Sequence, residues 1–136
     1  MSPVAADSLL AIHVKAILHF AAVRLSPAFR TVDGVRPACS TAWLRHELAH
    51  AVIDAVSHNR APRWLEEGFA IYLAAEGSMF ARYATKTKLS PDEIDKRLER
   101  PRSQQEMRIL YSLAYNQVFY LIQSGGEASV WKKLAA

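Results

Sequence analysis

The segment STAWLRHELAHAVIDAVS, residues 40–57, decides the architecture of the chain. Its apolar residues recur every four positions, which places them along one stripe of an α-helix: Leu44, Leu48, Val52 and Val56. Ser40 or Thr41 is a suitable N-terminal cap. The sequence therefore predicts a helix from this cap to about Val56, with polar residues on the face opposite the stripe.

Prolines, glycines and serine caps divide the flanking sequence into further helices. The first is expected from Ser2-Pro3 to before Ser26-Pro27, and the next follows the HELAH segment, from Pro62 to about Ala75 with Gly77 as its stop. Two more begin at capping boxes: one runs from Ser90 to before Pro101, and the other from Ser103 to Ser124. A last short helix is expected around Val130 to Leu134. Residues 78–88 are expected to be loop with some helix.

Residues 29–37, FRTVDGVRP, are the best candidate for β structure. Asp33-Gly34 lies between two short alternating arms, a pattern typical of a type I′ hairpin, and a plain loop is the alternative. We therefore expect a mainly α fold of the α+β kind, a helical domain with a small β-hairpin or sheet element.

Composition favours one globular domain over residues 1–136, because 51% of the residues are hydrophobic and 22% are charged. The net charge of +4 permits an anionic partner without requiring one. Between Arg82 and Arg108 eight basic residues face five acidic ones. Such a balance is typical of solvated helix faces, so no nucleic-acid partner is expected.

No run of 18 apolar residues occurs, so no membrane span is expected. The apolar stretch from Leu9 to Val23 is interrupted by polar residues and has no charged leader, which favours a folded helix over a signal peptide. The single cysteine, Cys39, excludes an internal disulfide framework and a cysteine-rich metal site. These features favour the cytoplasm without fixing the compartment.

HELAH, residues 46–50, is the candidate metal motif. Residues four apart on a helix lie about 40° apart around its axis, so His46 and His50 can point at one cation. Glu47 projects beside them, where its carboxylate can take a proton from a metal-bound water. Zinc suits neutral imidazoles. The alternative is an ordinary helix with two histidines on its polar face.

A second motif, WLEEGFA, follows at residues 64–70. HELAH followed by WLEEGFA resembles the gluzincin zinc metallopeptidases, the group that includes thermolysin and aminopeptidase-N-like enzymes. The resemblance implies one Zn²⁺ per chain, held by His46, His50 and Glu67, with Glu47 as the general base. It implies that Glu66 is a variable neighbour that hydrogen-bonds or faces solvent.

Two further stretches are similar to the same family. YSLAY, residues 111–115, resembles its tyrosine-bearing helix, which implies Tyr111 as the oxyanion donor and Tyr115 as the second choice. Half-buried packing tyrosines are the alternative. HAVID, residues 50–54, makes Asp54 a candidate acceptor for the second N–H of a histidine, or else a solvated carboxylate.

Gly68 directly follows the expected ligand Glu67. Glycine inside a helix costs about 1 kcal/mol relative to alanine, so it needs a reason. Close approach of the HELAH helix would be one, and a bend in the glycine's own helix is the alternative.

The resemblance implies a zinc-dependent peptidase acting on peptide or protein substrates, with an edge strand that pairs with extended substrate. The zinc ligands would be identical in a latent or non-catalytic zinc-binding regulatory domain of the same fold, which is therefore the alternative. Three other histidines have no matching motif and are expected to be structural or solvated: His13, His19 and His58.

Overall fold

The computed structural model describes residues 40–136, with side chains from residue 44 onward. The expected helix between Ser2 and Ser26 lies outside the described residues. So do the expected hairpin at residues 29–37 and Cys39. These expectations stay predictions.

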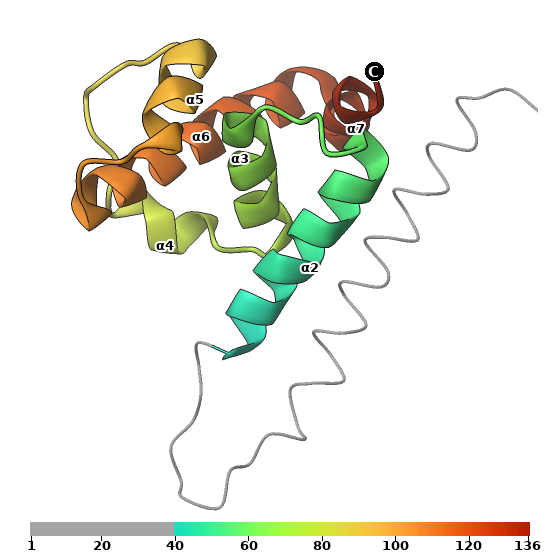
Figure 1. Ribbon diagram of the computed structural model, residues 1–136, viewed down its shortest axis with the longest axis horizontal. Coiled ribbons are helices and arrows are strands. Elements are labelled where there is room, and N and C mark those ends of the chain that lie inside the picture. The colour runs from blue at the N-terminus through green and yellow to red at the C-terminus, as the bar shows by residue number, and fades with distance from the viewer. Residues whose placement is uncertain (1–39) are drawn as a thin grey trace, which may run out of the picture.

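Six α-helices make up the described part of the chain (Figure 1). In chain order they are α2 (Ser40–Ser57), α3 (Arg63–Leu73), α4 (Gly77–Ala81), α5 (Pro91–Glu99), α6 (Gln104–Gly125) and α7 (Glu127–Ala135). The expectation of a mainly helical chain is confirmed. Residues 40–136 contain no strand, so the small β element is not found there.

Serine caps begin two of the helices as expected. Before α5 the hydroxyl of Ser90 accepts from the backbone N–H of Glu93, and the Glu93 carboxylate accepts from the Ser90 N–H, which completes a capping box. Before α6 the hydroxyl of Ser103 accepts from the backbone N–H of Glu106. The Glu106 carboxylate instead accepts from the N–H of Arg102, one residue further back, so this second box is incomplete.

The end of α3 differs from the expectation. The helix ends at Leu73, and Gly77 begins the short helix α4 instead of stopping α3. Ala75 lies in the left-handed region with φ 59°, a conformation that ends an α-helix.

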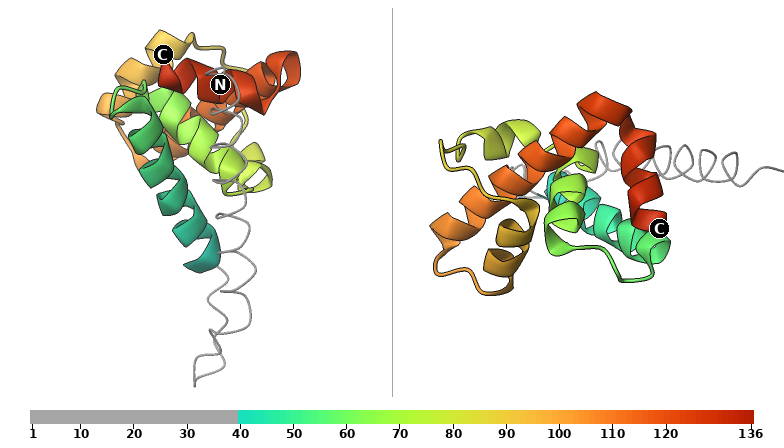
Figure 2. Two further views of the ribbon diagram at one scale, coloured as in Figure 1. Left: turned by 90° about the vertical axis from the view of Figure 1, so that its right-hand side faces the viewer. Right: turned by 90° about the horizontal axis from the view of Figure 1, so that it is seen from above.

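Helix α3 lies between α2 and α6 and contacts both (Figure 1). Figure 2 shows α7 turning back from the end of α6 toward the C-terminal end of α2, which it contacts. Phe69 of α3 is fully buried where these helices meet, and the ring of Trp131 on α7 packs against it edge-on at 4.7 Å. Core residues from α2 and α6, such as Ile53 and Val118, complete the same cluster.

Gly68 allows α3 and α6 to approach closely. A Cβ atom at this position would collide with the backbone carbonyl of Ala114 and lie 2.8 Å from a methyl group of Val118. Both residues belong to α6, so the expectation that Gly68 admits the HELAH helix was wrong. Consecutive residues lie about 100° apart around a helix, so Glu67 and Gly68 face different neighbours.

Within residues 40–136, no helix is both long enough and apolar enough to cross a membrane.

Replacing Gly68 with alanine is expected to lower the free energy of unfolding by about 1–3 kcal/mol, the usual cost of overpacking. A glycine-to-alanine change in an uncrowded helix has the opposite sign, because alanine is the better helix former by about 1 kcal/mol. Urea unfolding followed by circular dichroism measures the difference.

Ala55→Gly is the matched control, because Ala55 is exposed within α2 and its replacement reports helix propensity without packing. This control is expected to cost about 1 kcal/mol. A Gly68→Ala variant at least as stable as the parent would contradict the close contact between α3 and α6.

Candidate metal centre

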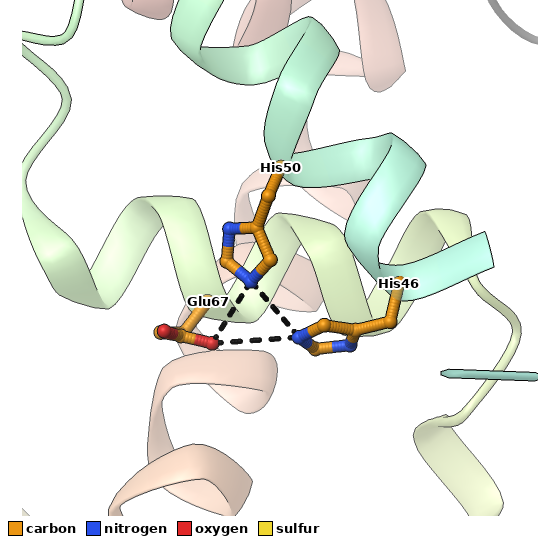
Figure 3. A group of neighbouring side chains, drawn as sticks. All are labelled: His46, His50 and Glu67. Atoms are coloured by element: carbon orange, nitrogen blue, oxygen red, sulfur yellow. Dashed lines mark hydrogen bonds and ion pairs between the residues drawn. The ribbon is translucent and has the colours of Figure 1, made fainter. Parts of the chain in front are cut away.

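The two histidines of HELAH meet on one side of α2 (Figure 3). His46 and His50 are one helical turn apart, and their Nε2 atoms lie 2.9 Å from each other. The rings are inclined at 63° with centroids 4.7 Å apart, so both Nε2 atoms face a common point. The buried residues Ala49 and Ile53 hold this helix against the core.

Glu67 of α3 reaches the same point. Its Oε2 lies 3.3 Å from Nε2 of His50 and 3.6 Å from Nε2 of His46. The Glu67 side chain is only 11% exposed, and this oxygen has no hydrogen-bond partner within the described part of the chain. A buried carboxylate oxygen without a partner is costly, which indicates that a proton or cation belongs beside it.

The three inward-facing atoms have the spacing of metal ligands. A tetrahedral ion with bonds of about 2.0–2.2 Å holds its ligand atoms about 3.3–3.6 Å apart. Both distances from Glu67 fall within this range, and the distance between the imidazoles is slightly shorter at 2.9 Å. His46, His50 and Glu67 could therefore hold a metal ion.

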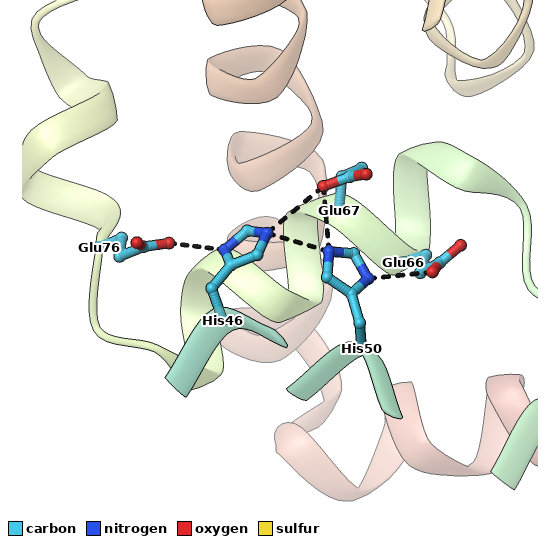
Figure 4. A network of polar contacts seen from close by, with 5 residues as sticks. All are labelled: His46, His50, Glu66, Glu67 and Glu76. Atoms are coloured by element: carbon cyan, nitrogen blue, oxygen red, sulfur yellow. Dashed lines mark hydrogen bonds and ion pairs between the residues drawn. The ribbon is translucent and has the colours of Figure 1, made fainter. Parts of the chain in front are cut away.

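Each imidazole is also held from its outer side by a carboxylate (Figure 4). Nδ1 of His46 lies 2.7 Å from Oε2 of Glu76, and Nδ1 of His50 lies 2.9 Å from Oε1 of Glu66. An ionised carboxylate only accepts hydrogen bonds, so each Nδ1 carries the proton. In a neutral ring the Nε2 lone pair then points inward, as metal ligation requires.

Without added positive charge this cluster is electrostatically unfavourable, because the Nε2 lone pairs of the two imidazoles and the carboxylate oxygen of Glu67 face one another. Burial opposes protonation of His46, but the facing carboxylates of Glu67 and Glu76 outweigh it and raise the pKa to about 9. The carboxylates of Glu66 and Glu67 raise the pKa of His50 to about 10. Burial would raise the pKa of Glu67, yet the two facing histidines lower it to about 2.

Glu47 is exposed on α2, next to His46. Its negative charge is one of those that raise the pKa of Tyr111.

The tyrosines of α6 occupy two different environments. Tyr111 is partly buried and packs edge-on against Phe80 at 5.8 Å. Burial and the charge of Glu67 raise its pKa, so its hydroxyl stays protonated and able to donate. Tyr115 stacks on Phe119, and a Cβ atom at Gly77 would collide with its hydroxyl. Tyr115 therefore packs against the turn between α3 and α4.

Asp54 does not occupy the position suggested by its spacing. Glu66 accepts the hydrogen bond from Nδ1 of His50, and Asp54 lies beside Glu66. Burial and the charge of Glu66 raise the pKa of Asp54. The reason is that helix α3 brings Glu66 to the outer side of the His50 ring, so Glu66 takes the place that Asp54 of α2 was expected to occupy.

Sequence reasoning missed Glu76, which is 30 residues from His46. The available signal was chemical: a ligating histidine needs an acceptor for its second N–H, and Glu76 is an acid at the end of the ligand-bearing helix. His58, which was expected to be structural or solvated, is exposed in the loop after α2 with φ 54°.

No protein family, curated protein or solved structure matches this chain. The geometry of the cluster and the chemistry of its residues therefore carry the functional argument.

Metal binding at this cluster is expected to release protons and to strengthen as the pH rises from about 6 to about 9. The raised pKa values mean that the imidazoles hold protons near pH 7, which a metal ion must displace. Glu67, with its pKa near 2, is already ionised and releases none. The affinity should rise about tenfold per pH unit for each proton released.

Calorimetric titration with Zn²⁺ in two buffers of different ionisation enthalpy measures the released protons directly. Glu67→Ala is the control, because it removes one ligand and should abolish or strongly weaken the binding. An affinity that stays constant over this pH range would contradict the raised histidine pKa values.

Proposed function

We propose that this chain is a zinc-dependent peptidase that hydrolyses peptide bonds. The observation that carries the proposal is the buried Oε2 of Glu67, which has no hydrogen-bond partner within residues 40–136 and faces two imidazole nitrogens at metal-ligand spacing. Two imidazoles and one carboxylate are a donor set found in catalytic zinc sites, where the fourth position stays open. The resemblance of HELAH and WLEEGFA to the gluzincins supports the same assignment.

Zinc bound there would supply a Lewis acid for the substrate carbonyl and would lower the pKa of water to about 7. Glu47 takes the proton from the attacking water and passes it to the leaving amine. The exposure of Glu47 beside the cluster supports this role, because both water and substrate can reach the carboxylate.

Tyr111 donates its hydroxyl proton as a hydrogen bond to the oxyanion that develops on the substrate carbonyl. Its raised pKa supports the role, because only the neutral phenol can donate. Residues 40–136 contain no edge strand for pairing with the substrate.

A zinc-binding domain without catalysis, or a latent peptidase, remains the second reading, because it would use the same ligands. Metal content and cleavage have to be measured on the same samples to separate the two. Elemental analysis of the parent and Glu67→Ala, beside a cleavage assay on a broad peptide mixture, makes that separation. One zinc per chain without cleavage would favour the non-catalytic reading, and no zinc in the parent would contradict both.

Glu47→Gln is expected to keep its zinc and to lose about 10²–10⁴-fold in kcat, because the amide cannot take the proton. The substitution preserves size, and residue 47 is not among the three ligand residues. Cleavage of the most reactive peptide from the mixture, with zinc content measured in parallel, tests this expectation. A variant that cleaves as fast as the parent would refute the role of Glu47.

Tyr111→Phe is expected to lower kcat by about 10²-fold or more, since it removes one oxyanion donor while keeping the ring. Tyr115→Phe is the matched control one helical turn away, and its packing against the turn at Gly77 predicts a much smaller effect. Steady-state kinetics on one peptide compare the two. If Tyr115→Phe costs more than Tyr111→Phe, the donor has been assigned to the wrong tyrosine.

A further inference from the structure

Glu76 makes the shorter of the two outer contacts to the imidazole pair. Its Oε2 lies 2.7 Å from Nδ1 of His46, and its side chain is only 10% exposed. The corresponding contact of Glu66 with His50 is 2.9 Å long, and the Glu66 side chain is 24% exposed. The carboxylate on His46 is thus both closer and better shielded from water.

The backbone around Glu76 is held by a specific turn. The N–H of Glu76 donates to the carbonyl of Ile71 at 3.0 Å, and the N–H of Ala75 donates to that of Tyr72 at 3.1 Å. This pair of bonds is the Schellman motif, with Ala75 in the left-handed conformation. The motif reverses the chain at the end of α3, so the residue that follows Ala75 points back toward α2.

The turn is also packed from its other side. A Cβ atom at Gly77 would collide with the hydroxyl group of Tyr115 on α6. Helix α6 therefore lies directly against the residue that follows Glu76. The backbone that carries Glu76 is thus fixed by its hydrogen bond to the end of α3 and, through Gly77, by the packing of α6.

We propose that Glu76 is the positioning residue of His46. By accepting a hydrogen bond from Nδ1–H of His46, it fixes the tautomer and the ring angle that direct Nε2 at the point shared with His50 and Glu67. The inference deepens the proposed function, because it rests on the same metal centre. Helix α3 and the turn after it then supply all three carboxylates of the cluster, and α2 supplies both imidazoles.

The consequence is a rank order that the sequence motifs do not contain. Loss of an outer acceptor of this kind typically costs 10–100-fold in metal affinity. Loss of the shorter and more buried contact should lower the metal affinity more, so removing Glu76 should weaken binding more than removing Glu66. Glu76→Gln should lose less than Glu76→Ala, because the amide oxygen can still accept from Nδ1.

The test is competitive titration of the full chain with Zn²⁺ against a chromophoric chelator, combined with the visible absorption spectrum of the Co²⁺-loaded protein. Glu76→Ala should bind Zn²⁺ about 10–100-fold more weakly than the parent. Its Co²⁺ spectrum should also change, because the angle of His46 at the metal is no longer fixed. Ala75→Gly is the control: it keeps Glu76 and favours the same turn, so it should match the parent in affinity and spectrum.

Two results would overturn the inference, and they are distinguishable. If the parent binds neither Zn²⁺ nor Co²⁺, the metal centre is absent, and the proposed function fails with it. If the parent binds both metals while Glu76→Ala matches it in affinity and spectrum, His46 is positioned without Glu76. The metal centre would then stand and only this inference would fall.

Discussion

Helix α3 packs against α2 on one side and α6 on another, and the rest of the structure depends on this double contact. Glu67 faces α2 and Gly68 faces α6, and these residues are adjacent in the chain. Because consecutive helical residues point about 100° apart, one helix can present a ligand to one side and a bare backbone to the other. The absence of a side chain at Gly68 lets α6 lie against α3. This packing fixes the position of α3 and with it the position of the Glu67 carboxylate.

The cluster between α2 and α3 is unbalanced in charge. Glu66, Glu67 and Glu76 surround two imidazoles that can be neutral, so the site attracts positive charge in the form of protons or a cation. The raised pKa values of the histidines and the lowered pKa of Glu67 are both expressions of this imbalance. In the metal-free protein, the histidine contribution to stability is present below about pH 6.5 and is lost as the pH rises toward 9 and 10. The Glu67 contribution has the opposite sign and is lost as the pH falls from about 4.5 toward 2.

A metal ion held by the cluster would resolve the same imbalance above neutral pH, where the protons leave. It would also join α2 to α3, because two of the candidate ligands belong to α2 and the third to α3 (Figure 3). Only three residues of α2 with described side chains are buried: Ala49, Ile53 and Ser57. The polar contacts of His46 and His50 with Glu66 and Glu67 add to the apolar contacts between α2 and α3. Metal binding at the cluster would therefore be coupled to the docking of α2 on α3.

The sequence by itself determined the features that one helix can carry. The four-residue spacing of apolar side chains, the serine caps at Ser90 and Ser103, and the pairing of His46 with His50 depend only on helical geometry. The tertiary structure decided which residues of other helices meet them: Glu66 in place of Asp54, Ala114 against Gly68, and Glu76 on His46. A local pattern reports the faces of its own helix, and it contains no information on the left-handed turn at Ala75 or on the packing of Tyr115 against Gly77. Contacts between residues far apart in the chain arise from how the helices pack, and only the folded chain contains them.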